Sequence, residues 1–211
     1  LQLSSILGAS RASSSNEMIV SQYEDISNLR SGCFQSCTYK ERGSDRVKRK
    51  HMFFFKTKES CTEWTDRINA SLGIIAGKRR KFLVILNPVS GPGRSQYFFD
   101  NIVKVMLEEA HIDPTLVVTE RQHHAFYLMS DACFGISQYR VIMVIGGDGL
   151  LFEVINGLAR RPNGKQILQD IPIAPIPGGS GNGLAKSVLF ESGNEYFSVQ
   201  SATFVAAKGV P

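Results

Sequence analysis

The stretch that most constrains the fold is residues 141–150, where the apolar run VIMVI leads directly into Gly146-Gly147-Asp148-Gly149. Such a run is typical of a strand buried on both faces. Apolar residues recur at helical spacing from residue 151 to residue 158, so a helix is expected after the turn. Glycines let the backbone approach a ligand closely, and Asp148 is expected at the carboxyl end of a parallel strand, where open α/β sheets bind ligands. The alternative is an ordinary turn in which Asp148 caps the helix.

Strand-like and helix-like segments alternate through the second half of the chain. Strands are expected over residues 82–86, 115–119, 141–145 and 171–176, and helices over residues 95–110, 120–136, 148–160 and 183–189. This alternation predicts an α/β fold with a parallel sheet flanked by helices. Pro172 and Pro175 make the fourth segment an edge strand or an irregular one. Residues 201–211 are expected to form a strand that is cut short.

The first part of the chain has a different organisation. Residues 1–27 are Ser-rich and are expected to be a disordered tail. Residues 28–76 are expected to form a small α+β unit with strands at 33–39 and 51–56 and a helix that begins with a capping box of Ser60 and Glu63. Trp64 on that helix gives a weak resemblance to the last part of a pleckstrin-homology-like module; the alternative is a core Trp of another small unit. Residues 77–81 are expected to be a basic linker, and residues 82–211 the α/β domain.

Composition narrows the class of protein. The 211 residues carry a net charge of +5, and the excess lies in the basic runs at 46–50 and 78–81. These runs are expected to be solvated, or to attract anionic lipid weakly, and no motif that binds nucleic acid accompanies them. The four cysteines lack the spacing of a zinc site and indicate reduced thiols. No apolar run reaches the roughly 18 residues of a membrane span, and no signal peptide is recognisable, so a cytoplasmic protein is expected.

Three glycine-rich turns each follow a strand-like segment and precede a helix-like one. They are residues 87–94 (NPVSGPGR), 146–149 (GGDG) and 177–183 (PGGSGNG). Because the strands are expected to be parallel, all three turns are expected at one edge of the sheet. Backbone N–H groups at helix N-termini bind phosphate well, so a triphosphate fits three converging turns. The turns match neither the P-loop motif nor the Rossmann motif, which implies a nucleotide held mainly by backbone.

The combination of motifs resembles the diacylglycerol-kinase-like lipid kinases, and among them the sphingosine kinases. The matching segments are Asn87-Pro88-x-Ser90-Gly91-x-Gly93, the Gly146-Gly147-Asp148-Gly149 turn with its helix Glu153-Val154-x-Asn156-Gly157-Leu158, and Pro177-x-Gly179-Ser180-Gly181-Asn182. Residues 119–125 (TERQHHA), Arg161-Pro162 and residues 179–185 (GSGNGLA) favour the sphingosine kinases. The resemblance covers residues 81–211.

The resemblance implies a role for individual residues. Asp148 matches the catalytic base, which takes the proton from the primary hydroxyl of the lipid as that oxygen attacks the γ-phosphate of ATP. The residues that match nucleotide contacts are Asn87, Ser90, Gly91, Gly93, Thr119, Gly146, Gly147, Gly149, Glu153, Gly179, Ser180, Gly181 and Asn182. Mg²⁺ is implied as the ion that offsets the phosphate charge, although the resemblance assigns no metal ligand. The implied partners are a sphingoid-base substrate and, transiently, a membrane surface.

Several of these residues also have a purely structural interpretation. Glu153 fits an ordinary carboxylate on a helix surface, and Thr119 fits the end of a strand. Asn182 fits a turn residue with positive φ. His123 and His124 are interpreted as helix-surface residues rather than catalysts.

The sequence also departs from the family pattern. Val89 and Pro92 stand where related kinases often carry basic or small residues, so Arg94 is the candidate for a phosphate contact there. The family has a second, mainly β domain, expected to begin near residue 211, so this piece alone is expected to turn over poorly. The leading hypothesis is an ATP-dependent kinase that converts sphingosine to sphingosine 1-phosphate. The alternatives are a ceramide or diacylglycerol kinase, or a non-catalytic scaffold that binds nucleotide or lipid.

Overall fold

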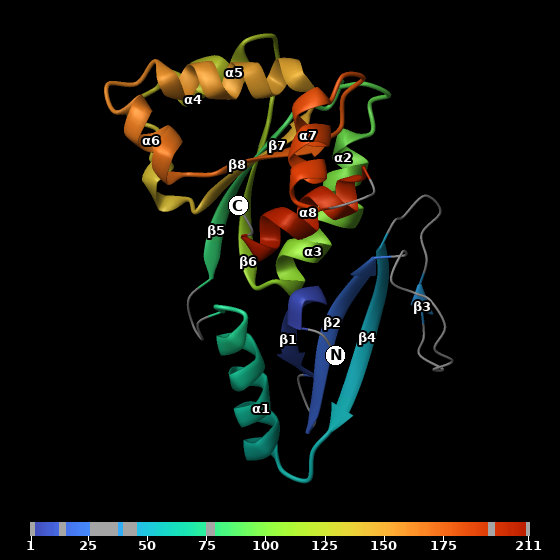
Figure 1. Ribbon diagram of the computed structural model, residues 1–211. Coiled ribbons are helices and arrows are strands. Elements are labelled where there is room, and N and C mark those ends of the chain that lie inside the picture. Colours follow the sequence, from blue (N-terminus) through green and yellow to red (C-terminus); the bar gives the residue numbers. More distant parts are fainter. Residues whose placement is uncertain are drawn as a thin grey trace.

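The computed structural model describes residues 3–12, 16–25, 38–39, 46–74, 79–193 and 197–209. Within these residues the strands form two four-stranded sheets, one antiparallel and one parallel (Figure 1). The strand expected over residues 33–39 lies mostly outside the described residues. Its last two residues, Thr38–Tyr39, are described and form the short strand β3. None of the described helices is both long enough and apolar enough to cross a bilayer.

The parallel sheet confirms the predicted α/β class. It contains β5 (Arg80–Leu86), β6 (Ile112–Val118), β7 (Val141–Gly146) and β8 (Ile173–Pro177), in the order β6-β5-β7-β8. All six residues of β7 are buried, as its apolar run predicted. This central position places the turn after β7 between the turns that follow its two neighbours.

The predicted edge strand is β8. Gly178 N–H donates to the carbonyl of Gly146 on β7. Backbone N–H groups point alternately to the two sides along a strand. The nitrogen atoms of Pro175 and Pro177 therefore face away from β7, toward the open side of β8. Proline has no N–H and is tolerated there without loss of a ladder hydrogen bond. The two prolines therefore suit the edge of the sheet.

Helices cover both faces of the parallel sheet. One face packs against α4 (His124–Ser130), α5 (Asp148–Ala159) and α6 (Gly164–Asp170). The other packs against α8 (Val199–Lys208), α7 (Gly183–Glu191) and a continuous helical segment made of α2 (Ser95–Phe98), a π-helical turn η3 (Phe99–Val103) and α3 (Lys104–Glu109). Figure 1 shows α4, α5 and α6 together, away from α3 and α8.

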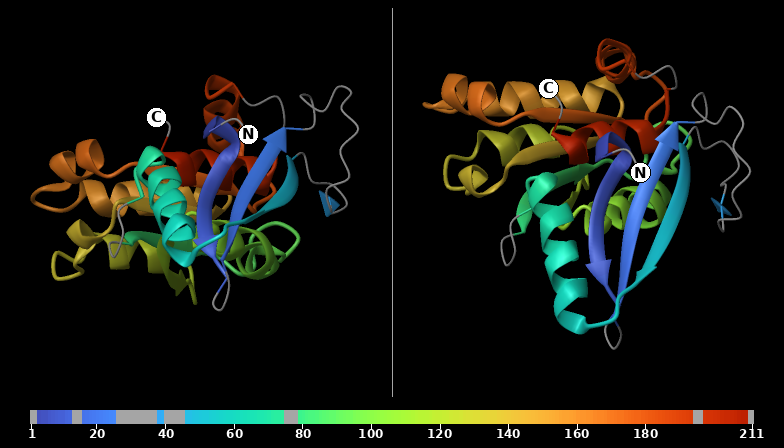
Figure 2. Two further views of the ribbon diagram at one scale, coloured as in Figure 1. Left: turned by 90° about the horizontal axis from the view of Figure 1, so that it is seen from below. Right: turned by 60° about the horizontal axis from the view of Figure 1, so that its bottom comes forward.

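The N-terminal unit is an antiparallel sheet with one helix. After a short 3-10 turn η1 (Leu3–Ser5), the strands β1 (Ile6–Arg11), β2 (Glu17–Asp25) and β4 (Arg46–Phe54) pair in the order β1-β2-β4-β3. The helix α1 (Lys58–Ser71) packs on this sheet around buried Cys61, and runs beside β1 in all three views (Figures 1 and 2).

The two units are joined by a mixed polar and aromatic interface. Glu109 on α3 accepts a hydrogen bond from Tyr23 Oη at 2.7 Å and pairs with Lys48 Nζ at 2.7 Å. Arg46 is buried, with its guanidinium 4.1 Å from the ring centroid of Phe204 on α8. The N-terminal sheet is therefore fixed to the helices that cover one face of the parallel sheet.

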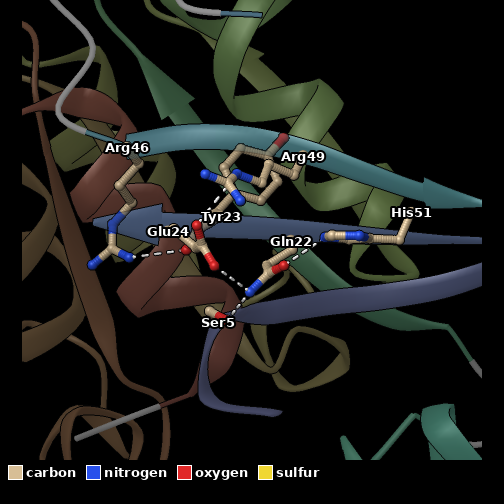
Figure 3. A network of polar contacts seen from close by, with 7 residues as sticks. All are labelled: Ser5, Gln22, Tyr23, Glu24, Arg46, Arg49 and His51. Atoms are coloured by element: carbon tan, nitrogen blue, oxygen red, sulfur yellow. Dashed lines mark hydrogen bonds and ion pairs between the residues drawn. The ribbon is translucent and has the colours of Figure 1, made fainter. Parts of the chain in front are cut away.

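A polar network runs along β2 and β4 beside this interface (Figure 3). Gln22 donates to Ser5 Oγ and to Glu24 Oε1, both at 2.9 Å, and its own oxygen lies 2.6 Å from His51 Nε2. Because an amide oxygen only accepts, His51 Nε2 must carry the proton. Burial, and then the charge of Arg49, lower the pKa of His51 below its usual 6.5.

Four sequence-based expectations for the N-terminal part need correction. Residues 6–11 and 17–25 are paired strands rather than a disordered tail, because Ile6, Ala9, Met18 and Val20 pack in one buried cluster with Cys61 of α1. The cap of α1 is Thr57, whose hydroxyl accepts from Ser60 N–H at 3.2 Å, so Ser60 is not the cap. The basic run at 46–50 is not simply solvated, since Arg46 is buried and Lys48 is paired. In the expected linker, Arg80 and Lys81 begin β5.

Two expectations for the α/β part were also wrong. Residues 199–208 form α8 rather than a strand, with Ser198 as the cap that accepts from Ser201 N–H at 3.0 Å. The helix expected over residues 120–136 is confined to His124–Ser130. It ends there because Asp131 is extended and the buried guanidinium of Arg161 binds the carbonyl oxygens of Asp131 and Phe134 in the loop that follows.

Candidate active site at the glycine turns

The three glycine turns meet at the carboxyl edge of the parallel sheet, as predicted. Asn87 N–H donates to Ile145 O at 3.2 Å, which links the first turn to the end of β7. Gly178 N–H donates to Gly146 O at 3.0 Å, which links the second turn to the third. Segments separated by up to 90 residues therefore converge around the end of β7.

The contact between the turns depends on missing side chains. A Cβ placed on Gly179 would lie 2.4 Å from the Cα of Gly147, and one on Gly91 would lie 2.8 Å from the carbonyl carbon of Gly179. Gly91 also has φ of 54°, in the left-handed region that favours glycine. The three turns can thus pack against one another only as glycine backbones, with their amides concentrated in a small volume.

Asp148 is the first residue of α5 and is exposed. Its side chain does not cap α5, because the cap residue is Gly147. Instead the carboxylate crosses to the N-terminus of α7, where Oδ2 accepts from Gly183 N–H at 2.8 Å and Oδ1 from Leu184 N–H at 3.3 Å. The interpretation of Asp148 as the cap of its own helix is therefore wrong.

The first turn is ordered by its own backbone and by Asn87. Asn87 Oδ1 accepts from Val89 N–H at 3.0 Å, and Gly93 N–H donates to Ser90 O at 3.0 Å. Arg94 follows the turn, and its guanidinium lies 5.3 Å from the ring centroids of both Tyr97 and Phe98. No ion pair involves Arg94 within the described part of the chain, so its charge is available beside the turn.

Thr119 and Glu153 belong to the wall beside the first two turns. Thr119 is buried, and its N–H donates to Leu86 O at 2.7 Å, directly before Asn87. Glu153 is partly buried on α5, and its Oε1 accepts from His123 N–H at 3.1 Å. The exposed His123 has φ of 62° and is the cap residue of α4, so it is not within the helix.

The third turn is closed by Asn182. Its Oδ1 accepts from Gly179 N–H at 3.0 Å, and its Nδ2 donates to Gly179 O at 2.6 Å. Gly181 O accepts from Asp148 N–H at 3.0 Å, and Ser180 is exposed. Asn182 has φ of −143°, so the interpretation of this residue as a positive-φ turn position is wrong.

Sequence reasoning missed the amides of Gly183 and Leu184 as part of the site. The available signal was the helix start directly after Asn182, which leaves the first amides of α7 without intrahelical partners.

Sequence reasoning also missed that Arg161 is structural. This buried guanidinium donates to the carbonyl oxygens of Met129, Asp131 and Phe134, and burial lowers its pKa. A pocket of about 500 Å³ beside Arg161 lies at the amino ends of β7 and β8, away from the turns.

The donor set fits a nucleotide that brings its own metal ion. Within the described residues, no group of three or more His, Cys, Asp or Glu side chains is placed to hold a metal. Kinase Mg²⁺ is commonly held by one or two carboxylates together with the substrate phosphates. Asp148 is an exposed carboxylate at the turns, so a magnesium ion coordinated mainly by phosphate is compatible with this site.

Comparison with known proteins gives consistent matches. The sequence profile of the diacylglycerol kinase catalytic domain matches residues 81–206. Sphingosine kinase 1 of Rattus norvegicus is 41% identical over 115 residues, which are 54% of this chain and 29% of that protein. Sphingosine kinase 1 of Arabidopsis thaliana is 35% identical over 150 residues, 70% of this chain and 30% of that protein. The chain therefore spans less than a third of these curated relatives.

A match among solved structures is a diacylglycerol kinase from Bacillus anthracis str. Sterne, which is 28% identical and has a TM-score of 0.47. The match covers 63% of this chain and 43% of that one.

Proposed function

Because the chain belongs to the diacylglycerol kinase catalytic domain family, we propose that it forms the nucleotide-binding, base-bearing part of an ATP-dependent lipid kinase. The proposed acceptor is the primary hydroxyl of a sphingoid base. The observation that carries the proposal is the convergence of three glycine turns on one exposed carboxylate, Asp148. Relatives named sphingosine kinase, 35–41% identical, support this acceptor.

The site supplies two of the components that phosphoryl transfer needs. The turn amides bind the phosphates, since clustered backbone N–H groups at strand–helix turns favour anions. Asp148 takes the proton from the lipid hydroxyl as the hydroxyl oxygen attacks the γ-phosphorus. The bond between the γ-phosphorus and the oxygen that bridges it to the β-phosphate then breaks. Mg²⁺, when bound with ATP, offsets the charge that builds on the transferred group. Arg94 is the side chain that we assign to an additional phosphate contact.

The acceptor reaches this site from a membrane. A sphingoid base partitions into bilayers, so the proposed function requires the protein to meet a membrane surface at least transiently, and we propose that it does so from the cytoplasm. The notable alternatives within the same chemistry are ceramide and diacylglycerol, which also offer a primary hydroxyl.

The test uses the full-length protein that contains this chain. Transfer of ³³P from Mg·ATP to sphingosine, ceramide and diacylglycerol is measured for the natural protein and for Asp148→Asn. We expect label on sphingosine and a loss of about 10²- to 10⁴-fold in the variant, the range for a general base. Label on another lipid instead would contradict sphingosine as the acceptor. Equal labelling by the natural protein and by Asp148→Asn would contradict the role of Asp148 as the base. ATP binding without any transfer would favour a non-catalytic scaffold.

A further inference from the structure

We propose that Asn182 is a positioning residue, whose side chain fixes the third turn so that the first two amides of α7 hold the Asp148 carboxylate in place. The inference rests on the proposed kinase function, because it takes Asp148 as the base. It replaces the role that the sequence suggested for Asn182, which was a contact with the nucleotide.

The first observation is that the Asn182 side chain is engaged within its own turn. Its oxygen and its nitrogen both bind the backbone of Gly179, at 3.0 and 2.6 Å. The pair of bonds closes a small ring around residues 179–182 and fixes the orientation of the side-chain amide. Asn182 is also the cap residue of α7, so the same ring sets where that helix begins.

The second observation is that Asp148 is held by the residues on either side of Asn182. Its backbone N–H donates to Gly181 O at 3.0 Å, and its two carboxylate oxygens accept from Gly183 and Leu184. Three hydrogen bonds therefore connect Asp148 to three residues that flank Asn182, namely Gly181, Gly183 and Leu184. Among the described residues, the hydrogen bonds of the Asp148 carboxylate run to α7 rather than to its own helix.

Holding the carboxylate in this way leaves it competent as a base. A carboxylate offers about four acceptor positions, and two are used by the α7 amides. The remaining positions can accept from a lipid hydroxyl that must approach to about 2.6–3.2 Å. An error of about 1 Å in such geometry can cost roughly 10²-fold in rate, so the device that sets the geometry affects turnover directly.

The decisive experiment is a double-mutant cycle in the full-length protein, with sphingosine as acceptor. The four proteins are the natural protein, Asn182→Ala, Asp148→Asn and the double variant. We expect Asn182→Ala to lower kcat by about 10- to 100-fold and to leave the KM for ATP within about twofold. In the Asp148→Asn background the same change should cost less than about threefold, since residues that act as a unit are non-additive.

Two results would overturn the inference while leaving the kinase function intact. One is a tenfold rise in the KM for ATP with kcat unchanged, which identifies Asn182 as a nucleotide contact. The other is losses that multiply across the cycle, which show that Asn182 does not act through Asp148. Absence of transfer to any lipid by the natural protein is a different outcome, and it would overturn the proposed function together with the inference.

A second pair of variants covers the case in which Asn182→Ala does not fold. Gly183→Pro removes the N–H that binds Asp148 Oδ2, and proline is accepted at the first position of a helix. Gly183→Ala keeps that N–H, and its added Cβ would lie 3.5 Å from Asp148 Oδ2, an ordinary contact. With both melting temperatures checked, we expect a kcat at least about fivefold lower for proline than for alanine. Equal kcat values would contradict the positioning role.

Discussion

Glu153 Oε1 accepts a hydrogen bond from the backbone N–H of His123, 30 residues earlier, at 3.1 Å. The bond holds a residue with φ of 62° directly before α4. Glu153 therefore ties the helix that begins at Asp148 to the segment that follows Thr119, and so fixes one wall of the candidate site.

This link predicts different outcomes for two substitutions of Glu153. Glu153→Ala removes the acceptor, and we expect the loosened wall to raise the KM for ATP several-fold. Glu153→Gln keeps an acceptor oxygen, so its KM should change less. Steady-state kinetics of the full-length protein compare the two. An equal rise for both variants would mean that the negative charge, rather than the bond to His123, is what the nucleotide site needs.

Packing between the turns predicts that Gly179→Ala is destabilising. Its Cβ would lie 2.4 Å from Gly147 Cα, and overpacking of this kind typically costs about 1–3 kcal/mol. The matched control is Gly149→Ala, because no atom lies within 4 Å of an added Cβ there. Thermal unfolding should show a lower midpoint for the first variant alone, and a similar midpoint for both would contradict the tight packing.

The lowered pKa of His51 predicts a pH dependence of stability. Burial disfavours the protonated ring, so below about pH 6.5 the unfolded chain binds more protons than the folded one. The free energy of unfolding should therefore fall as the pH falls through the window just below 6.5. Protonation would also place a charge near Arg49, while Glu24 acts in the opposite sense.

The control for this pH effect is His51→Gln, which has no titratable group at that position. Urea unfolding at pH 7.5 and 5.5 should show a smaller difference between the two pH values for the variant than for the natural protein. The same difference in both proteins would assign the effect to other groups.

The guanidinium of Arg161 predicts a large loss on substitution. It donates to the backbone carbonyl oxygens of Met129 in α4 and of Asp131 and Phe134 in the loop before β7. Arg161→Lys keeps the charge but cannot reach all three, because its ammonium is a point donor rather than a planar fork. We expect a destabilisation of about 2–4 kcal/mol. The exposed Arg160→Lys is the matched control, and comparable unfolding midpoints for both would refute the structural role.

The strands of the parallel sheet and the glycine turns were predictable because each follows from the local sequence pattern. Their convergence was predictable because the carboxyl ends of parallel strands lie at the same edge of a sheet. The buried run before Gly146, the helical spacing after Asp148 and the parallel arrangement together place the turns at one edge. The direction of the Asp148 side chain was not predictable in this way. It depends on α7, which begins 35 residues later, and a strand–turn–helix pattern alone favours a local cap.

The N-terminal strands were missed because their serines mimic a disordered tail. Ile6, Met18 and Val20 are buried, yet the serines at 4, 5, 10 and 13–15 dominate the composition of this part of the sequence. β1 pairs with β2, but the second partner of β2 is β4, which lies about 30 residues further on, so this pairing leaves no local signal in the sequence. α8 was mistaken for a strand for a related reason, because Thr203, Phe204 and Val205 favour strands and packing against the parallel sheet decides otherwise.

The prolines of β8 have a consequence for misassembly. A partly folded chain that exposes the parallel sheet offers its edges as templates on which a second chain can add a strand. Along β8, the outward positions of Pro175 and Pro177 provide no donors for such an addition. Strand addition is therefore less favourable along β8 than along β6, the opposite edge of the described sheet, so charged substitutions intended to improve solubility belong on β6 rather than on β8.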